Sequence, residues 1–253
     1  MLFDTHTHLD DKKFDADRGE LIASLKSQGI SLLVNIGADM KSSQQSILLA
    51  EKYDFIYASV GVHPCDTKNL TDDDLNTLEK MAKHEKVVAI GEIGLDYYWD
   101  EPEREIQKEW FTKQLLLAKK LNMPYIIHDR DAHADTLEII KKCGYTNGVM
   151  HCFSGSAEFA QEVIKMGMYV SLSGTVTFKN AKKAQEVAQS IPLDRLLIET
   201  DSPYLTPEPF RGKRNNSAYV KYAAEKIADI RGISFDELAR ITLDNGKRFY
   251  NIK

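Results

Sequence analysis

Short apolar segments alternate with longer segments of helical periodicity along the whole chain. Such alternation predicts a parallel sheet whose strands are joined by crossover helices. The eight strand candidates are Leu2–Thr5, Leu32–Ile36, Ile56–Val62, Val87–Ile90, Tyr125–Ile127, Gly148–His151, Tyr169–Leu172 and Leu196–Ile198. Each is short and largely apolar, as expected for a strand that is buried on both faces. Eight cycles favour a closed (β/α)8 TIM barrel over a doubly wound open sheet, which would produce a similar alternation.

The segments between the strands carry the signals of amphipathic helices. One of them repeats apolar residues at helical spacing, with Glu and Lys on the other face: Ile106, Trp110, Leu117 and Leu121. Ser234 followed by Glu237 resembles a capping box and predicts the start of a final helix. The stretch Pro203–Asn216 is rich in proline and basic residues without periodicity, so we expect a long loop after the eighth strand.

Composition narrows the class of protein. A chain of 253 residues can form one barrel domain, so we expect a single domain over residues 1–253. No apolar run approaches the roughly 18 residues that cross a bilayer, and no signal peptide is visible, which predicts a cytoplasmic protein without a membrane partner. Three widely spaced cysteines indicate reduced thiols. The net charge of -5 implies that any contact with nucleic acid is local.

Two histidines lie at the end of the first predicted strand. In Asp4-Thr5-His6-Thr7-His8 the imidazoles are two residues apart, so they point to the same side of a strand and can bind one ion. The alternative is that both simply decorate a loop. The ends of other strands weaken that alternative.

Further metal-binding side chains stand at other strand ends. Glu92 follows the fourth strand between glycines, His128 ends the fifth, His151 ends the sixth, and Asp201 follows the eighth. Barrel active sites are assembled where the carboxyl ends of the strands meet. Four imidazoles and two carboxylates exceed what one tetrahedral ion needs, so the set predicts two divalent metal ions that Glu92 can bridge. Nitrogen-rich ligands suit zinc, manganese or iron better than calcium, and magnesium would bind only weakly.

These features resemble those of the TatD-type deoxyribonucleases, a family of amidohydrolase-like metallohydrolases, from Phe3 to the last helix. The matching motifs are Phe3-Asp4-Thr5-His6-Thr7-His8-Leu9-Asp10, Gly61-Val62-His63-Pro64, Gly91-Glu92-Ile93-Gly94-Leu95-Asp96, His151-Cys152-Phe153-Ser154-Gly155, Glu199-Thr200-Asp201-Ser202-Pro203-Tyr204 and Arg211-Gly212-Lys213-Arg214-Asn215. Asn216-Ser217 departs from the family pattern, in which the basic loop commonly continues with Glu-Pro or a similar pair.

The resemblance implies a (β/α)8 barrel with a divalent-metal site. In it, His6, His8 and Asp201 hold one ion, His128 and His151 hold the other, and Glu92 bridges them. The resemblance also implies hydrolysis of DNA phosphodiesters, as a 3'-5' exonuclease acting on single-stranded ends, with magnesium often the activating ion. DNA is then the expected partner, and no obligate protein partner is evident.

Three further residues have a candidate functional role and also a simpler explanation. Asp201 is the candidate general base, because a carboxylate that touches metal and water can accept a proton, but it can equally be a ligand alone. His63 follows the third strand and is assigned to the scissile phosphate, against a structural role in hydrogen bonding a loop. Glu199 is a candidate partner that orients a ligand histidine, against a buried salt bridge.

The remaining candidates concern the substrate. Arg211, Lys213 and Arg214 follow Asp201 and are expected to neutralise phosphate, although charged runs are usually solvated loops. Tyr97-Tyr98-Trp99 can stack unpaired bases or merely pack a loop. His84 and His133 receive no role.

Two other functions compete with the nuclease. A small-molecule amidohydrolase or esterase would use the same two-metal chemistry on carbonyl groups, but the basic loop favours phosphate. A barrel that serves only as a binding scaffold is disfavoured, because six costly ligands would then serve no purpose.

Overall fold

The computed structural model describes residues 1–253, and its eight strands form one sheet in the order β1 to β8. The strands are β1 (Leu2–Thr7), β2 (Ile30–Asn35), β3 (Ile56–Val60), β4 (Val87–Asp96), β5 (Tyr125–Arg130), β6 (Gly148–Met150), β7 (Tyr169–Leu172) and β8 (Leu196–Ile198). The helices are α1 (Arg18–Leu25), α2 (Met40–Lys52), α3 (Asp72–Met81), α4 (Arg104–Leu121), α5 (His133–Cys143), α6 (Ala157–Lys165), α7 (Lys182–Ser190), α8 (Val220–Arg231) and α9 (Phe235–Phe249). The predicted alternation of strands and helices is confirmed.

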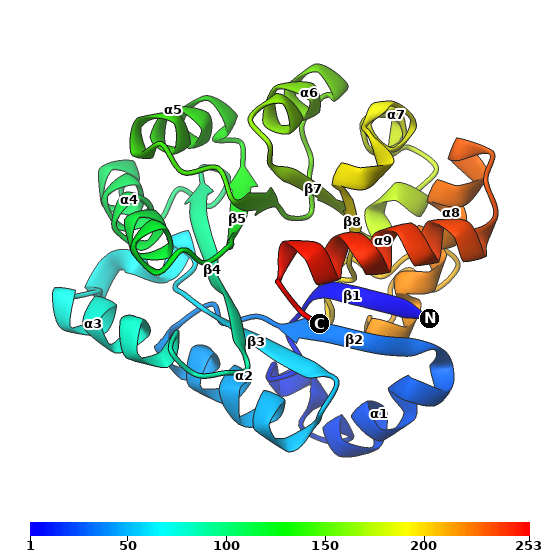
Figure 1. The fold of residues 1–253 in the computed structure, drawn as a ribbon, viewed down its shortest axis with the longest axis horizontal. Coiled ribbons are helices and arrows are strands. Elements are labelled where there is room, and N and C mark those ends of the chain that lie inside the picture. The colour runs from blue at the N-terminus through cyan, green and yellow to red at the C-terminus, as the bar shows by residue number, and fades with distance from the viewer. The chain divides into compact units, whose positions relative to one another are not determined.

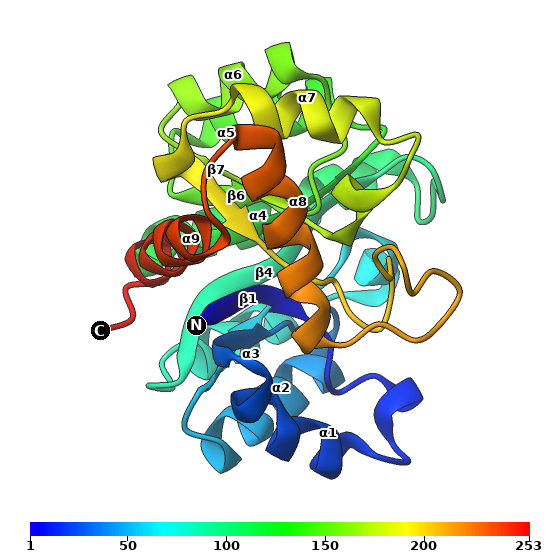
Figure 2. The same ribbon diagram turned by 90° about the vertical axis from the view of Figure 1, so that its right-hand side faces the viewer.

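The chain divides into two compact units, of which the first comprises Met1–Asn35 and Cys152–Lys253. Within it, β1 pairs in parallel with β2, and β7 with β8. Helices α8 and α9 pack against β1, as Figures 1 and 2 show. The Phe3 ring lies 5.9 Å from the ring of Tyr250, whose hydroxyl donates to the Thr5 carbonyl. Helix α9 therefore covers the amino-terminal part of β1, away from the histidines at its other end.

The second unit comprises Ile36–His151 and contains β3 to β6 in one parallel run. Helix α2 packs on β3 and α4 packs on β4 (Figure 1). The predicted amphipathic helix is α4, which buries Trp110, Leu117 and Phe111. That the two units act as a single domain stays a prediction.

Several strand boundaries differ from those expected. The largest difference is at β4, which continues to Asp96, so Glu92 lies inside the strand and does not follow it. Strand β5 likewise runs past His128 to Arg130. The cause is pairing: the backbones of the two strands stay in register from Ile93 to Asp96, and this holds a glycine-rich segment extended despite its poor strand propensity.

Other features follow the expectations from the sequence. Pro203–Asn216 contains no helix or strand, and the Ser234 side chain accepts a hydrogen bond from the Glu237 amide at the start of α9. The three cysteines form no disulfide. None of the helices combines the length and the apolar character that a membrane crossing requires.

Candidate metal centre

Three metal-binding side chains of the first unit converge on one point. The Nε2 atoms of His6 and His8 are 3.2 Å apart, and Asp201 Oδ1 lies 3.6 Å from the first and 3.4 Å from the second. Two ligands on a zinc-like ion with bonds of about 2.1 Å are separated by about 3.4 Å. The three atoms thus have the spacing that a single divalent ion requires.

The backbone holds this group in place. Asp201 donates its amide to the His6 carbonyl at 2.9 Å, and the His8 amide donates to the Ser202 carbonyl at 2.8 Å. Asp201 itself adopts a left-handed conformation with φ of 54°, which turns the chain directly after β8. Asp is one of the few residues other than Gly that tolerates this region. The turn places the Asp201 carboxylate beside the two imidazoles.

The buried carboxylate of Asp4 also holds the segment that leads to Asp201 in place. Asp4 is fully buried, and its two oxygens accept hydrogen bonds from the amide and the hydroxyl of Thr200, at 2.8 and 2.7 Å. Burial raises the pKa of Asp4 to about 7, although the hydrogen bonds from Thr200 and Ser217 work in the opposite direction. Asp4 thereby connects β1 to the residues that precede Asp201, a role that the sequence motifs did not indicate.

Glu199, expected to orient a ligand histidine, is almost completely buried. Its Oε1 accepts a hydrogen bond from the Cys152 amide at 2.8 Å. The carboxylate therefore fastens the start of the segment that follows His151 in the chain. Its predicted role as an orienting residue stays a prediction.

In the second unit, three imidazoles lie around one carboxylate oxygen. Glu92 Oε1 lies 2.8 Å from His128 Nδ1, 2.8 Å from His151 Nε2 and 3.9 Å from His63 Nε2. His128 Nδ1 and His151 Nε2 are 3.5 Å apart. Glu92 is buried beside these rings, and a buried carboxylate requires cationic or hydrogen-bonding partners. The two Glu92 contacts are hydrogen-bonding distances, and the three atoms are close enough together to become ligands of one divalent ion.

A glycine makes the approach of β4 to β5 possible. A Cβ on Gly94 would lie 2.0 Å from the carbonyl oxygen of His128, and the φ of Gly94 is 142°, a value that side chains disfavour. Because the strands meet this closely, Glu92 and Asp96 project from β4 on both sides of the His128 ring. Gly94 is thus a requirement of the site's geometry.

Asp96 is a site residue that the sequence motifs alone did not reveal. Its Oδ2 lies 2.9 Å from His128 Nε2, and its Oδ1 accepts the amides of Tyr98 and Trp99. Burial raises the pKa of Asp96, but the hydrogen bond from His128 and those from the backbone outweigh it, so the net shift is downward. The alternation of Glu92, Gly94 and Asp96 along one strand face is the signal that would have found it.

The two rings that face Glu92 from β5 and from the segment after β3 have opposite pKa shifts. Burial lowers the pKa of His128, yet its hydrogen bonds to Asp96 and Glu92 outweigh burial and raise it. Burial, followed by the neighbouring charge of His128, lowers the pKa of His63 to about 3. His63 is therefore a neutral imidazole whose Nδ1 accepts the Cys65 amide, which leaves Nε2 on the side of Glu92.

The basic loop after β8 is only partly available to a substrate. Arg214 makes two short hydrogen bonds to the carboxylate of Asp17, which place an opposite charge beside its guanidinium. The Arg211 guanidinium lies 3.9 Å from the centre of the Phe178 ring, and Lys213 lies over Phe210. Arg211 and Lys213 are exposed. The two residues without a carboxylate partner here are the stronger candidates for phosphate.

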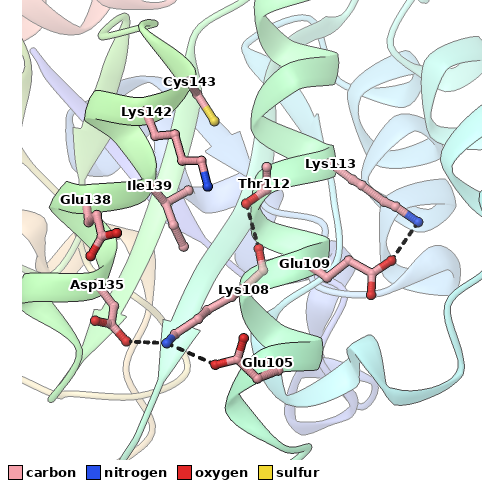
Figure 3. Close-up of a pocket in the computed structure, with 10 residues that line it drawn as sticks. All are labelled: Glu105, Lys108, Glu109, Thr112, Lys113, Asp135, Glu138, Ile139, Lys142 and Cys143. Atoms are coloured by element: carbon pink, nitrogen blue, oxygen red, sulfur yellow. Dashed lines mark hydrogen bonds and ion pairs between the residues drawn. The ribbon is translucent and has the colours of Figure 1, made fainter.

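The two histidines that received no role have structural contacts. His84 pairs with Glu51 on the surface, and His133 at the start of α5 hydrogen bonds to Asp129 at 2.7 Å. A groove of about 600 Å³ lies between α4 and α5 and has no histidine in its lining, whose residues are drawn in Figure 3. Several of its charged residues pair with each other, as Lys108 does with Asp135 at 2.8 Å and Lys113 with Glu109 at 2.9 Å. The groove therefore lacks the chemistry of the metal-binding groups.

Comparison with known proteins shows to which family the chain belongs. Residues 3–251 match the model of the TatD-related DNase family. The chain belongs to this family. It is 51% identical to the metal-dependent hydrolase YabD of Bacillus subtilis over the full length of both proteins. It is 38% identical to the metal-dependent hydrolase YcfH of Escherichia coli, over 100% of this chain and 96% of YcfH. The protein is a metal-dependent hydrolase of the TatD family, as the motifs predicted.

The fold is confirmed by a solved structure. YjjV, a TatD homologue from Escherichia coli, superimposes with a TM-score of 0.94 at 30% identity, over 100% of this chain and 98% of YjjV. The eight parallel strands of this TatD-family protein thus belong to a TIM-barrel-like amidohydrolase fold, as expected. The open-sheet alternative is wrong, because β1 also contacts β8, and Thr7 at the end of β1 forms a parallel bridge with Ser202 in the segment after β8.

Proposed function

We propose that this protein hydrolyses phosphodiester bonds in DNA with two divalent metal ions, as a 3'-5' exonuclease that acts on single-stranded ends. The observation that carries the proposal is the pair of ligand groups, His6–His8–Asp201 and Glu92–His128–His151, in each of which the ligand atoms lie close enough together for one ion. Family membership supports the choice of DNA. The sharing of Glu92 by both ions rests on the resemblance noted in the sequence.

The donor set fits divalent metals. Imidazole nitrogens and carboxylate oxygens suit zinc or manganese, and magnesium would bind more weakly. Such ions supply a Lewis acid for the phosphoryl oxygen and a water of lowered pKa. His6, His8 and Asp201 would hold one ion, and His128 and His151 the other, together with Glu92.

The protein's own groups have distinct tasks in this proposal. Asp201 is part exposed at the turn after β8, where its carboxylate can accept the proton of the attacking water. His63 is held neutral by burial, and its Nε2 can donate a hydrogen bond to a non-bridging phosphate oxygen. Glu199 keeps the segment after His151 in place through the Cys152 amide.

The basic residues are the basis for preferring phosphate over a carbonyl substrate. Arg211 and Lys213 are exposed and have aromatic rather than acidic neighbours, so their charge is available to a nucleic-acid backbone. Arg214 shapes the loop through Asp17 in this proposal. With a net charge of -5, such a local patch provides the attraction that the remainder of the protein lacks.

The decisive experiment uses protein reconstituted with Mg²⁺, Mn²⁺ or Zn²⁺ and DNA labelled at the 5' end. Stepwise shortening of a single strand from its 3' end, faster than that of a duplex, is expected. Asp201→Ala should abolish it, whereas Asp244→Ala on the surface of α9 should not. Absence of cleavage with all three metals, combined with hydrolysis of an acyl ester or lactone, would overturn the proposal in favour of a carbonyl substrate.

A further inference from the structure

Two aromatic side chains directly after β4 are exposed to solvent. Trp99 is 64% exposed and Tyr98 is 57% exposed, and their rings contact each other edge to face with centroids 5.3 Å apart. Tyr97 differs from both, because its hydroxyl donates to Asp135 and the Arg104 guanidinium covers its ring. Of the three aromatic residues singled out in the sequence, Tyr97 is thus a packing residue, and the other two present their rings outward.

Neighbouring groups hold the two exposed rings in fixed positions. Asp96 Oδ1 accepts the amides of both residues, at 3.0 Å from Tyr98 and 2.9 Å from Trp99. The Arg130 guanidinium at the end of β5 lies 3.8 Å from the centre of the Tyr98 ring, which fixes that ring by a cation–π contact. Exposed apolar area costs free energy in water, so a surface that fixes two large rings in solvent is expected to have a ligand.

We propose that Tyr98 and Trp99, with Arg130 behind them, form a platform on which unpaired bases of single-stranded DNA stack. This inference rests on the proposed function and names the part of the substrate that the platform binds. Bases in a duplex already stack on each other, whereas the bases of a single strand offer free π faces. The platform thus accounts for a preference for single-stranded ends that metal ligands alone do not provide.

The surrounding charge indicates contact with bases instead of phosphates. Asp100, Glu101 and Glu103 follow Trp99, and only Asp100 has a close cationic partner, Arg104 at 2.7 Å. Phosphates would be repelled by such a segment, but the neutral faces of the bases would not. The part of the affinity that Trp99→Ala removes is therefore expected to depend only weakly on salt.

The same carboxylate connects the platform to the metal-binding group. Asp96 Oδ2 contacts His128 Nε2 at 2.9 Å, while Oδ1 holds the amides under the two rings. Any shift of the segment that carries the platform therefore acts on the ring that faces Glu92. Asp96 is in this sense a positioning residue, which keeps a stacked base and the ligand His128 in a constant relationship.

The test measures binding without cleavage, in EDTA, with an oligothymidylate labelled for fluorescence anisotropy. Trp99→Ala and Tyr98→Ala should each weaken binding about 5- to 150-fold, which corresponds to about 1–3 kcal/mol per stacked base. Trp99→Phe should restore most of it, because a phenyl ring also stacks. Leu116→Ala removes a different exposed apolar side chain, one that lies on α4. It serves as the control and should bind DNA like the unaltered protein.

A second measurement uses the protein's own fluorescence. The chain has only two tryptophans, and Trp110 is buried with 6% exposure, so quenching by DNA should come from Trp99 and vanish in Trp99→Phe. An oligonucleotide of abasic sugars should bind the unaltered protein and Trp99→Ala equally. If base-containing DNA also binds the unaltered protein and Trp99→Ala with equal affinity, or if DNA leaves Trp99 emission unchanged, the platform is refuted. If DNA quenches Trp99 emission but is not cleaved when metal is present, the nuclease proposal is refuted instead.

Discussion

Asp96 and Glu92 hold opposite nitrogens of the same ring: Asp96 Oδ2 is 2.9 Å from His128 Nε2, and Glu92 Oε1 is 2.8 Å from His128 Nδ1. A carboxylate on the outer nitrogen fixes the proton there and directs the lone pair of Nδ1 toward a metal. The arrangement is that of a ligand histidine with its supporting carboxylate. Asp96 therefore supports metal binding indirectly, through the ligand His128.

Asp96→Asn should therefore weaken metal binding about 10- to 100-fold, the range seen when such supporting groups are removed. An amide in this position can donate to Nε2 and would favour the tautomer with the proton on Nδ1. Isothermal titration with Mn²⁺ or Zn²⁺ measures the effect. Asp72→Asn, at an exposed residue that pairs with Lys113, is the matched control. Equal metal affinity of Asp96→Asn and the unaltered protein would remove Asp96 from the site.

A second prediction concerns Gly94, where a Cβ would lie 2.0 Å from the His128 carbonyl oxygen. Gly94→Ala combines this clash with an unfavourable φ and should lower the free energy of unfolding by about 3 kcal/mol or more. Gly167 also has a positive φ, but a Cβ added there would have no atom within 4 Å. Gly167→Ala should cost only about 1–2 kcal/mol. Urea unfolding compares the two, and equal losses would show that the close approach of β4 and β5 is unimportant.

Much of the fold and of the site was predictable because both depend on local patterns. Apolar runs alternate with helical periodicity, and His6 with His8, or Glu92 between glycines, stand close to where apolar strand segments end. The extension of β4 was not predictable from its own residues, because glycines favour a turn unless β5 pairs with them. The pairing of Arg214 with Asp17 joins residues 197 positions apart. Contacts of that range have no signal in a single sequence.

Removal of metal should reduce thermal stability, because ions that bind the folded chain and not the unfolded chain stabilise the folded state. At a metal concentration 100-fold above Kd, each ion adds about 2.7 kcal/mol. For a chain of this size, 1 kcal/mol shifts Tm by about 2–4 °C, so EDTA should lower Tm by about 5–10 °C for each ion released. Asp201→Ala should show a smaller EDTA effect, since one ion has lost a ligand. Identical melting curves with and without EDTA would contradict binding to the folded protein.

The buried carboxyl of Asp4 predicts how stability changes with pH in the metal-free protein. Its pKa is about 7 in the folded chain, mainly through burial, and about 3.9 in an unfolded chain. Between these values the folded protein keeps the proton that the unfolded chain releases, so stability falls as pH rises from about 4 to 7.

Asp4→Asn imitates the protonated form, because its amide can donate to the Thr200 hydroxyl while its oxygen accepts the Thr200 amide. The variant lacks the loss of stability that ionisation causes. Relative to the unaltered protein, it should gain up to about 1.4 kcal/mol per pH unit between pH 5 and 7, then remain ahead by a constant amount above pH 7. Urea unfolding in EDTA at pH 5, 6, 7 and 8 measures this difference. A difference that does not change with pH would mean that Asp4 is ionised throughout, with its charge fully compensated by Thr200 and Ser217.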